Sequence, residues 1–188
     1  MEASTPSFAE NPRARAVAGP VADRVTVTAA LVGAACLLSA VESMLPPLGG
    51  LPWLRIGLGN IAVVVALLIA GPRTAMAVSV GRLAVMSVLA GTLGGPAFVL
   101  ASAGAAASLV TMWVLSRRPH LTAVGWSAAG AVAHVGAQFG AASLLLSSPW
   151  LLALLPATGL VALSLGALVG HLALTVSARL PLEYSRVR

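Results

Sequence analysis

Six long apolar stretches, separated by short segments rich in proline, glycine and arginine, occupy most of this sequence. Hydrophobic residues make up 59% of the 188-residue chain and charged residues 9%, which leaves too little polar surface to cover a water-soluble globule. A membrane span needs roughly 20 apolar residues. The sequence therefore predicts an all-α integral membrane protein, a bundle of six transmembrane helices at about 25–45, 56–70, 74–90, 97–115, 124–146 and 150–178.

Two polar tails flank this predicted six-helix membrane domain at 25–178. Residues 1–24 contain prolines and charges without apolar periodicity, so we expect a disordered cytoplasmic tail. Residues 179–188 are expected to form a short cytoplasmic tail. The chain has no room for a second soluble domain.

The distribution of arginine predicts how the helices are oriented. Short loops rich in arginine stay in the cytoplasm, and with both termini inside, only Arg55 falls in an outer segment. The expected inner segments hold Arg13, Arg15, Arg24, Arg73, Arg117, Arg118, Arg179, Arg186 and Arg188. This pattern predicts a multi-pass protein of the cell membrane with cytoplasmic termini. It also explains the net charge of +6 without a nucleic-acid partner, because the arginines form no basic face.

A few polar side chains interrupt the apolar stretches or stand at their ends. An ionised group at the bilayer centre costs roughly 2.5–3.5 kcal/mol, so each one needs a partner or a function. Gly57 and Gly59 stand beside them and would let a ligand or a neighbouring helix approach the backbone. We expect the polar groups to converge on one outward-facing pocket that binds a small molecule: Glu42, Arg55, Asn60, Arg82, His134 and Gln138.

Five of these six residues, all except Asn60, also have a purely structural interpretation. Glu42 is close enough to a span end to reach interfacial water. Arg82 could form an ion pair with Glu42, and Arg55 could anchor its helix at the membrane surface. His134 and Gln138 lie on one helical face, where an interhelical hydrogen bond is the simplest role for either alone.

The sequence also bears on metals, nucleotides and partner helices. No second histidine, cysteine or acid stands at ligand spacing from His134, so we expect no metal site. No GxxxxGK[ST] loop is present, so the chain itself is expected to hold no cofactor, and any ATP would be hydrolysed on a partner. Ala30 and Ala34 have the spacing of a close helix contact, but alanine is so common here that such pairs arise by chance.

The order of these motifs resembles a known family. The chain has an acid before prolines at the end of the first span, RIGLGN at 55–60, an arginine in the third span, Gly-Gly-Pro at 94–96 and AVAHVGAQ at 131–138. This is similar to the bacterial Gx transporter family, also labelled heptaprenyl diphosphate synthase component I. Members of that family are similar to substrate-binding S components of energy-coupling factor transporters.

The resemblance implies a six-helix bundle that captures a small molecule from outside and works with a separate energising membrane subunit and ATPases. It implies that Ala30 and Ala34 contact that subunit. Three positions depart from the family pattern: Arg55 replaces a lysine, Gly59 replaces an alanine, and Val135 stands where an asparagine usually follows the histidine.

The second family label suggests an alternative function. Prenyl diphosphate synthesis needs clustered aspartates to hold magnesium, and this chain has one aspartate, Asp23, in a tail. The chain is therefore not expected to be an enzyme, although a non-catalytic accessory subunit of a heptaprenyl diphosphate synthase fits. A passive scaffold would not need Arg82 and His134 deep in the membrane.

Overall fold

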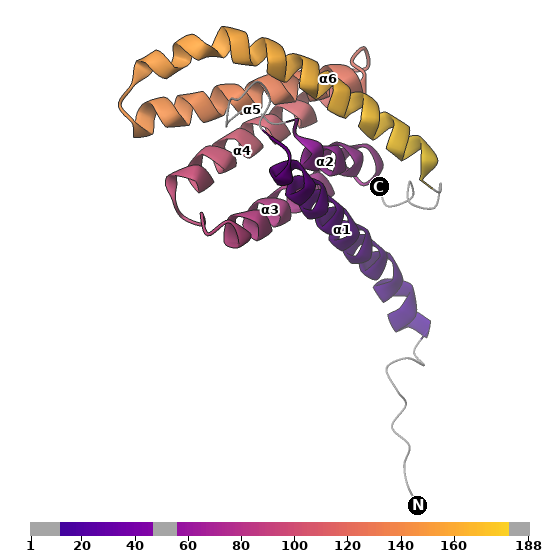
Figure 1. Ribbon diagram of the computed structural model, residues 1–188. Helices are drawn as coiled ribbons and strands as arrows, with labels where there is room; N and C mark the ends of the chain where they lie inside the picture. Colours follow the sequence, from indigo (N-terminus) through magenta and orange to yellow (C-terminus); the bar gives the residue numbers. More distant parts are fainter. Residues whose placement is uncertain (1–11, 47–55, 181–188) are drawn as a thin grey trace, which may run out of the picture.

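Helices make up the described part of the chain, which is residues 12–46 and 56–180 of a computed structural model (Figure 1). No strand occurs in these two ranges. The helices, in chain order, are α1 (Pro12–Met44), α2 (Leu58–Ile69), α3 (Pro72–Leu89), α4 (Pro96–Ser116), α5 (Ala123–Leu145), a 3₁₀ helix η3 (Pro149–Leu154) and α6 (Leu155–Arg179). The all-α class predicted from the sequence is confirmed.

Proline and glycine set the boundaries of several helices. Gly71 has a φ of 84°, in a region that L-residues with a side chain rarely adopt, and Pro72 follows it as the first residue of α3. Pro96 is likewise the first residue of α4. Proline suits the first helical turn because its missing N–H group would have no partner there. These breakers act locally, which is why the predicted limits of α2 to α5 lie within about two residues of the observed ones.

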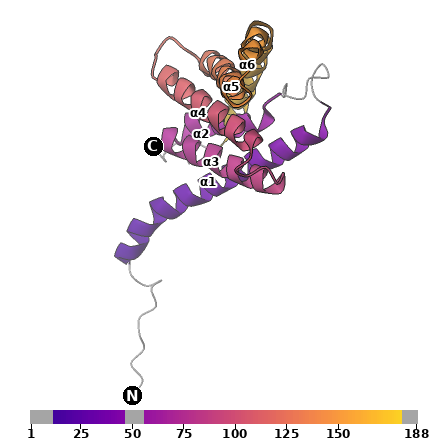
Figure 2. The same ribbon diagram turned by 90° about the vertical axis from the view of Figure 1, so that its left-hand side faces the viewer.

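The helices pack as two groups of three that meet at α2. The first group is α1, α2 and α3, and the second is α4, α5 and α6, which run side by side in Figures 1 and 2. Helix α2 also contacts α6 and, less extensively, α5. It is only 12 residues long, yet seven of them are buried. The core of the bundle therefore surrounds this short central helix.

Two glycines bring α5 and α6 into close contact. A Cβ atom at Gly170 would lie 2.7 Å from the carbonyl oxygen of Ala123 and 2.8 Å from Cα of Val124. A Cβ atom at Gly166 would lie 2.9 Å from Cα of Ala128. The two glycines are four residues apart on one face of α6, so they form the small-xxx-small pair that lets helix backbones touch.

Four helical segments have the length and composition to cross a membrane: Asp23–Met44, Pro96–Ser116, Ala123–Leu145 and Pro149–Arg179. Helix α2 is about 18 Å long, which is shorter than the roughly 30 Å of hydrocarbon in a bilayer. Its short length is compatible with a membrane because the neighbouring helices, rather than lipid, cover it. Helix α3 is not among the four and carries Arg73 and Arg82. The long apolar helices indicate a membrane protein, while six complete spans remain a prediction.

Helix α1 begins earlier than the sequence predicts. It starts at Pro12 rather than near Val25, so 12–24 are helical where a disordered tail was expected. Alanine and arginine, which alternate at 13–16, favour helix strongly enough to extend it past the apolar stretch. The early part of α1 projects away from the other helices (Figures 1 and 2). Residues 1–11 and 181–188, which belong to the two predicted tails, lie outside the described residues.

Candidate functional site

A cavity of about 210 Å³ lies between the two groups of helices, at the N-terminal end of α2. We call it the polar cavity. Apolar side chains, including Val64, Met112 and Val169, form part of its wall. Its polar and glycine lining comes from all six helices and the residue before α2: Glu42, Gly57, Asn60, Arg82, Ser108, Ser127, His134, Gln138 and Gly166. Six of the residues singled out from the sequence thus meet around one space.

Glu42 holds the start of α2. Its Oε1 accepts a hydrogen bond from the backbone N–H of Gly57 at 2.5 Å, and its Oε2 accepts one from Leu58 at 2.9 Å. The side chain is 7% exposed. The first N–H groups of a helix have no partner within the helix and carry partial positive charge, so a carboxylate stabilises them. Glu42 thus acts as a cap supplied by α1 to a helix 15 residues away in sequence.

Arg82 reaches across the cavity from α3 to α2 and α1. Its guanidinium donates to Oδ1 of Asn60 at 3.1 Å and to Oγ of Ser39 at 3.5 Å. Among the described residues it makes no ion pair, and its buried Nε has no hydrogen-bond partner. Because Glu42 is already bonded to the N–H groups of α2, the charge of Arg82 is left without a bonded carboxylate in this part of the chain. The ion pair with Glu42 considered from the sequence is absent from the described contacts.

The two glycines of the RIGLGN motif serve different purposes. Gly57 has a φ of 83° and lines the cavity directly before α2, where its left-handed conformation points its N–H at Glu42. Gly59 is buried, and a Cβ atom there would clash with Oγ of Ser39 and lie 2.6 Å from the guanidinium of Arg82. It therefore makes room for the Arg82 side chain and for α1, rather than for a ligand.

His134 and Gln138 line the cavity from α5, one turn apart as expected. They pack over Gly104 of α4, where a Cβ atom would lie 2.8 Å from the His134 ring and 2.9 Å from Cγ of Gln138. The buried Nδ1 of His134 has no hydrogen-bond partner among the described residues. This nitrogen does not make the interhelical hydrogen bond considered from the sequence, but the His134 ring does bond the backbone of Gly104 in α4.

The sequence did not single out three serines: Ser108 and Ser127, which line the cavity, and Ser39, which lies behind Arg82. Ser39 bonds Arg82, and Ser108 and Ser127 are 4% and 3% exposed at the cavity. Ser39 precedes Glu42 by three residues, so the helical period places both on one face, and that spacing would have found it. Ser108 and Ser127 gave no comparable signal, because small residues occur throughout α4 and α5.

Three predicted residues that the structure describes, Gly59, Ala30 and Ala34, do not line the cavity. Arg55 lies outside the described residues. Ala30 and Ala34 are exposed on the face of α1 that points away from the other helices, so they are free to meet a partner. Within 12–46 and 56–180, no group of three or more histidine, cysteine or acidic side chains is arranged to hold a metal ion.

A comparison with protein families identifies the chain. A family model described as heptaprenyl diphosphate synthase component I matches residues 31–176. The chain belongs to this component I family. The match runs from the middle of α1 to the end of α6 and includes every residue that lines the polar cavity. No curated protein and no solved structure matches the chain significantly.

The component I name implies a partner subunit, since it describes one component of a prenyl diphosphate synthase. This is consistent with a non-catalytic subunit. The four long apolar helices indicate that this member of the component I family is a membrane protein.

Proposed function

We propose that this protein is the substrate-binding membrane subunit of a transporter, similar to the S component of an energy-coupling factor transporter. It takes up a small molecule from the outside of the cell membrane. A separate energising membrane subunit and ATPases complete the transporter, and ATP is used only on those partners. The exposed face of α1 around Ala30 and Ala34 is the contact for the energising subunit.

One observation carries this proposal: an arginine and a histidine with unpaired buried nitrogens face the same cavity inside an apolar bundle. A buried donor or acceptor without a hydrogen-bond partner costs roughly 1–3 kcal/mol, and more when it is charged. Arg82 Nε and His134 Nδ1 both lack a partner. A ligand with a hydrogen-bond acceptor would satisfy Arg82 Nε, and an anionic group would compensate the charge of Arg82. His134 Nδ1, which donates or accepts according to the tautomer of the ring, would pair with a matching polar group of the ligand. The arrangement supports a ligand with a carboxylate or a similar anionic group.

The size of the cavity limits the ligand further. A volume of about 210 Å³ equals about seven water molecules at roughly 30 Å³ each. It is smaller than the roughly 300–1,000 Å³ of pockets that hold drug-sized ligands. The substrate class that fits is therefore a small, acceptor-rich solute, anionic or zwitterionic.

We expect a small carboxylate-bearing solute to raise the thermal unfolding midpoint of the purified protein. At a ligand concentration about a hundredfold above Kd, binding adds about 2.7 kcal/mol, which corresponds to roughly 5–10 °C for a chain of this size. The measurement is a thermal-shift screen of water-soluble vitamins and small metabolites in detergent.

Two pairs of variants test whether the shift comes from the polar cavity. Arg82→Gln and His134→Ala should each abolish it. Arg179→Gln and His171→Ala are the matched controls, because both control residues are exposed and lie outside the cavity. A shift that survives in both cavity variants, or a panel without any stabilising compound, would count against solute capture.

The family name favours a second function, that of a non-catalytic accessory subunit of a heptaprenyl diphosphate synthase. In that case the purified protein should increase the rate or the product chain length of a soluble prenyl diphosphate synthase subunit. Product analysis by chromatography, with and without this chain in lipid nanodiscs, measures the effect. Stimulation without any solute-induced thermal shift would replace the transporter proposal with this one.

A further inference from the structure

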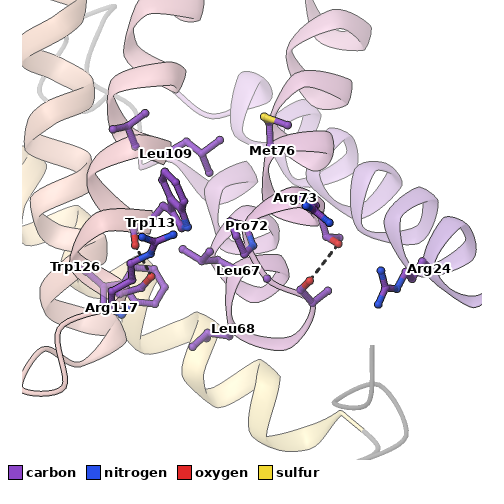
Figure 3. Close-up of a pocket in the computed structure, with 15 residues that line it drawn as sticks. Arg24, Leu67, Leu68, Pro72, Arg73, Met76, Leu109, Trp113, Arg117 and Trp126 are labelled. Carbon is purple, nitrogen blue, oxygen red and sulfur yellow. Dashed lines mark hydrogen bonds between the residues drawn. The ribbon is translucent and has the colours of Figure 1, made fainter. Parts of the chain in front are cut away.

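A second and larger cavity lies at the opposite end of α2, between the ends of several helices (Figure 3). Its volume is about 990 Å³, and it shares no lining residue with the polar cavity. We call it the arginine pocket and define it by six of its lining residues: Arg24, Leu67, Arg73, Trp113, Arg117 and Trp126. Neither the sequence motifs nor the proposed solute capture gives it a role.

Three arginines from three different helices surround this pocket. Arg24 belongs to α1, Arg73 to the first turn of α3, and Arg117 caps the end of α4. No acidic side chain is among the described residues that line it. The guanidinium of Arg117 lies 4.1 Å from the centre of the Trp113 ring, so a cation–π contact holds it beside the cavity. The pocket therefore concentrates positive charge.

The N-terminus of α3 opens into the same pocket. Gly71 precedes the helix without any side-chain cap, and both Gly71 and Thr74 line the cavity. Uncapped N–H groups at a helix start attract anions and complement phosphate oxygens. This end of α3 adds to the field of the arginines, and the two features together favour a phosphate group over a neutral ligand.

The rest of the pocket is apolar and leads to the outer surface of the helices. Leu67 and Trp126 are 8% and 4% exposed and form its interior. At its edge, Met76 of α3 and Val110 of α4 are 53% and 55% exposed. Figure 3 shows Met76 and Leu109 on the side of the pocket opposite Leu68. A hydrocarbon chain has an apolar path from the pocket to the surface that lipid would cover.

We propose that the arginine pocket binds an amphiphile whose phosphate-bearing headgroup has a net negative charge. The phosphate group of the ligand sits at the start of α3 beside Arg73, while Arg24 and Arg117 add positive charge from opposite sides of the pocket (Figure 3). The hydrocarbon chain of the ligand lies over Leu67, Trp113 and the exposed edge. Basic pockets between transmembrane helices at the cytoplasmic side hold anionic lipid headgroups in this manner. An anionic phospholipid of the membrane and a long-chain prenyl diphosphate both have this chemistry.

The test measures ligand affinity of the full-length protein, purified and delipidated in a mild detergent, by native mass spectrometry. The probes are phosphatidylglycerol, geranylgeranyl diphosphate, phosphatidylcholine and inorganic diphosphate. We expect the first or second probe to bind about tenfold more tightly than the two others. Retention of phosphatidylglycerol alone would identify a membrane lipid as the ligand, and retention of geranylgeranyl diphosphate alone would identify a prenyl diphosphate. Either result supports the proposal.

A pair of double variants separates the pocket from general surface charge. Arg73→Gln with Arg117→Gln should weaken binding of the preferred probe about tenfold or more. Arg118→Gln with Arg179→Gln removes the same charge from residues outside the pocket and should leave affinity within about twofold. Equal losses in both double variants would overturn the proposal. The proposal would also be overturned if phosphatidylcholine or inorganic diphosphate bound as tightly as the preferred amphiphile. This second comparison needs only the unaltered protein.

Discussion

Gly170→Ala should lower the thermal unfolding midpoint of this protein substantially. The new methyl group would lie 2.7 Å from the carbonyl oxygen of Ala123 and 2.8 Å from Cα of Val124. Both contacts are backbone atoms, which no change of side-chain rotamer can move away, so α5 and α6 must separate. Overpacking of this kind costs about 1–3 kcal/mol, which corresponds to roughly 2–12 °C for a chain of this size.

The same helix provides the control for this prediction. Gly159 also lies in α6, and a Cβ atom there would have no neighbour within 4 Å. Gly159→Ala should leave the midpoint unchanged or raise it by the equivalent of about 0.4–1 kcal/mol, because alanine reduces the freedom of the unfolded chain. Differential scanning fluorimetry of the three proteins in one detergent measures both changes. If Gly170→Ala has the same unfolding midpoint as the unaltered protein, the backbones of α5 and α6 are not in close contact at Gly170.

Glu42→Ala should destabilise the protein even when no ligand is present. The substitution leaves the N–H groups of Gly57 and Leu58 without the carboxylate that accepts both. Hydrogen bonds to a charged group contribute about 1.5–3 kcal/mol each. A total loss of about 3 kcal/mol would lower the unfolding midpoint by roughly 6–12 °C.

Glu42→Gln provides an intermediate case, since the amide keeps the size and one acceptor oxygen but loses the charge. Asp23→Ala is the control, because Asp23 is an exposed acid in the same helix. The midpoints of all three variants are compared without added solute. If Glu42→Ala is as stable as the unaltered protein but loses solute binding, the carboxylate serves the ligand and the capping role is wrong.

The sequence predicted the membrane character, the helical class and the approximate helix limits, because each depends on local information. Apolar stretches of sufficient length favour helices in a membrane, and the pairs Gly71-Pro72 and Gly95-Pro96 mark where α3 and α4 start. The start of α1 at Pro12 was missed, since helix propensity continues where hydropathy stops.

The same reasoning selected most of the polar cavity. Charged and amide side chains are expensive in an apolar stretch, so a list of the exceptions already contained Asn60, Arg82, His134 and Gln138. The sequence could not show which groups these side chains bond to. That Glu42 holds the start of α2 and leaves Arg82 unpaired depends on which helix end meets which, and no local pattern in the sequence encodes this.

Small residues mark the limit of prediction most clearly. The chain has nineteen glycines and many more small-residue pairs than helix contacts, so Ala30 with Ala34 and Gly166 with Gly170 look alike in the sequence. In the structure the alanines are exposed and the glycines bring two backbones together. Composition and hydropathy alone determined that this chain forms apolar helices and where they break. Only the tertiary structure decided which faces meet, which charges stay unpaired and which cavities form, because these depend on contacts between residues far apart in the chain.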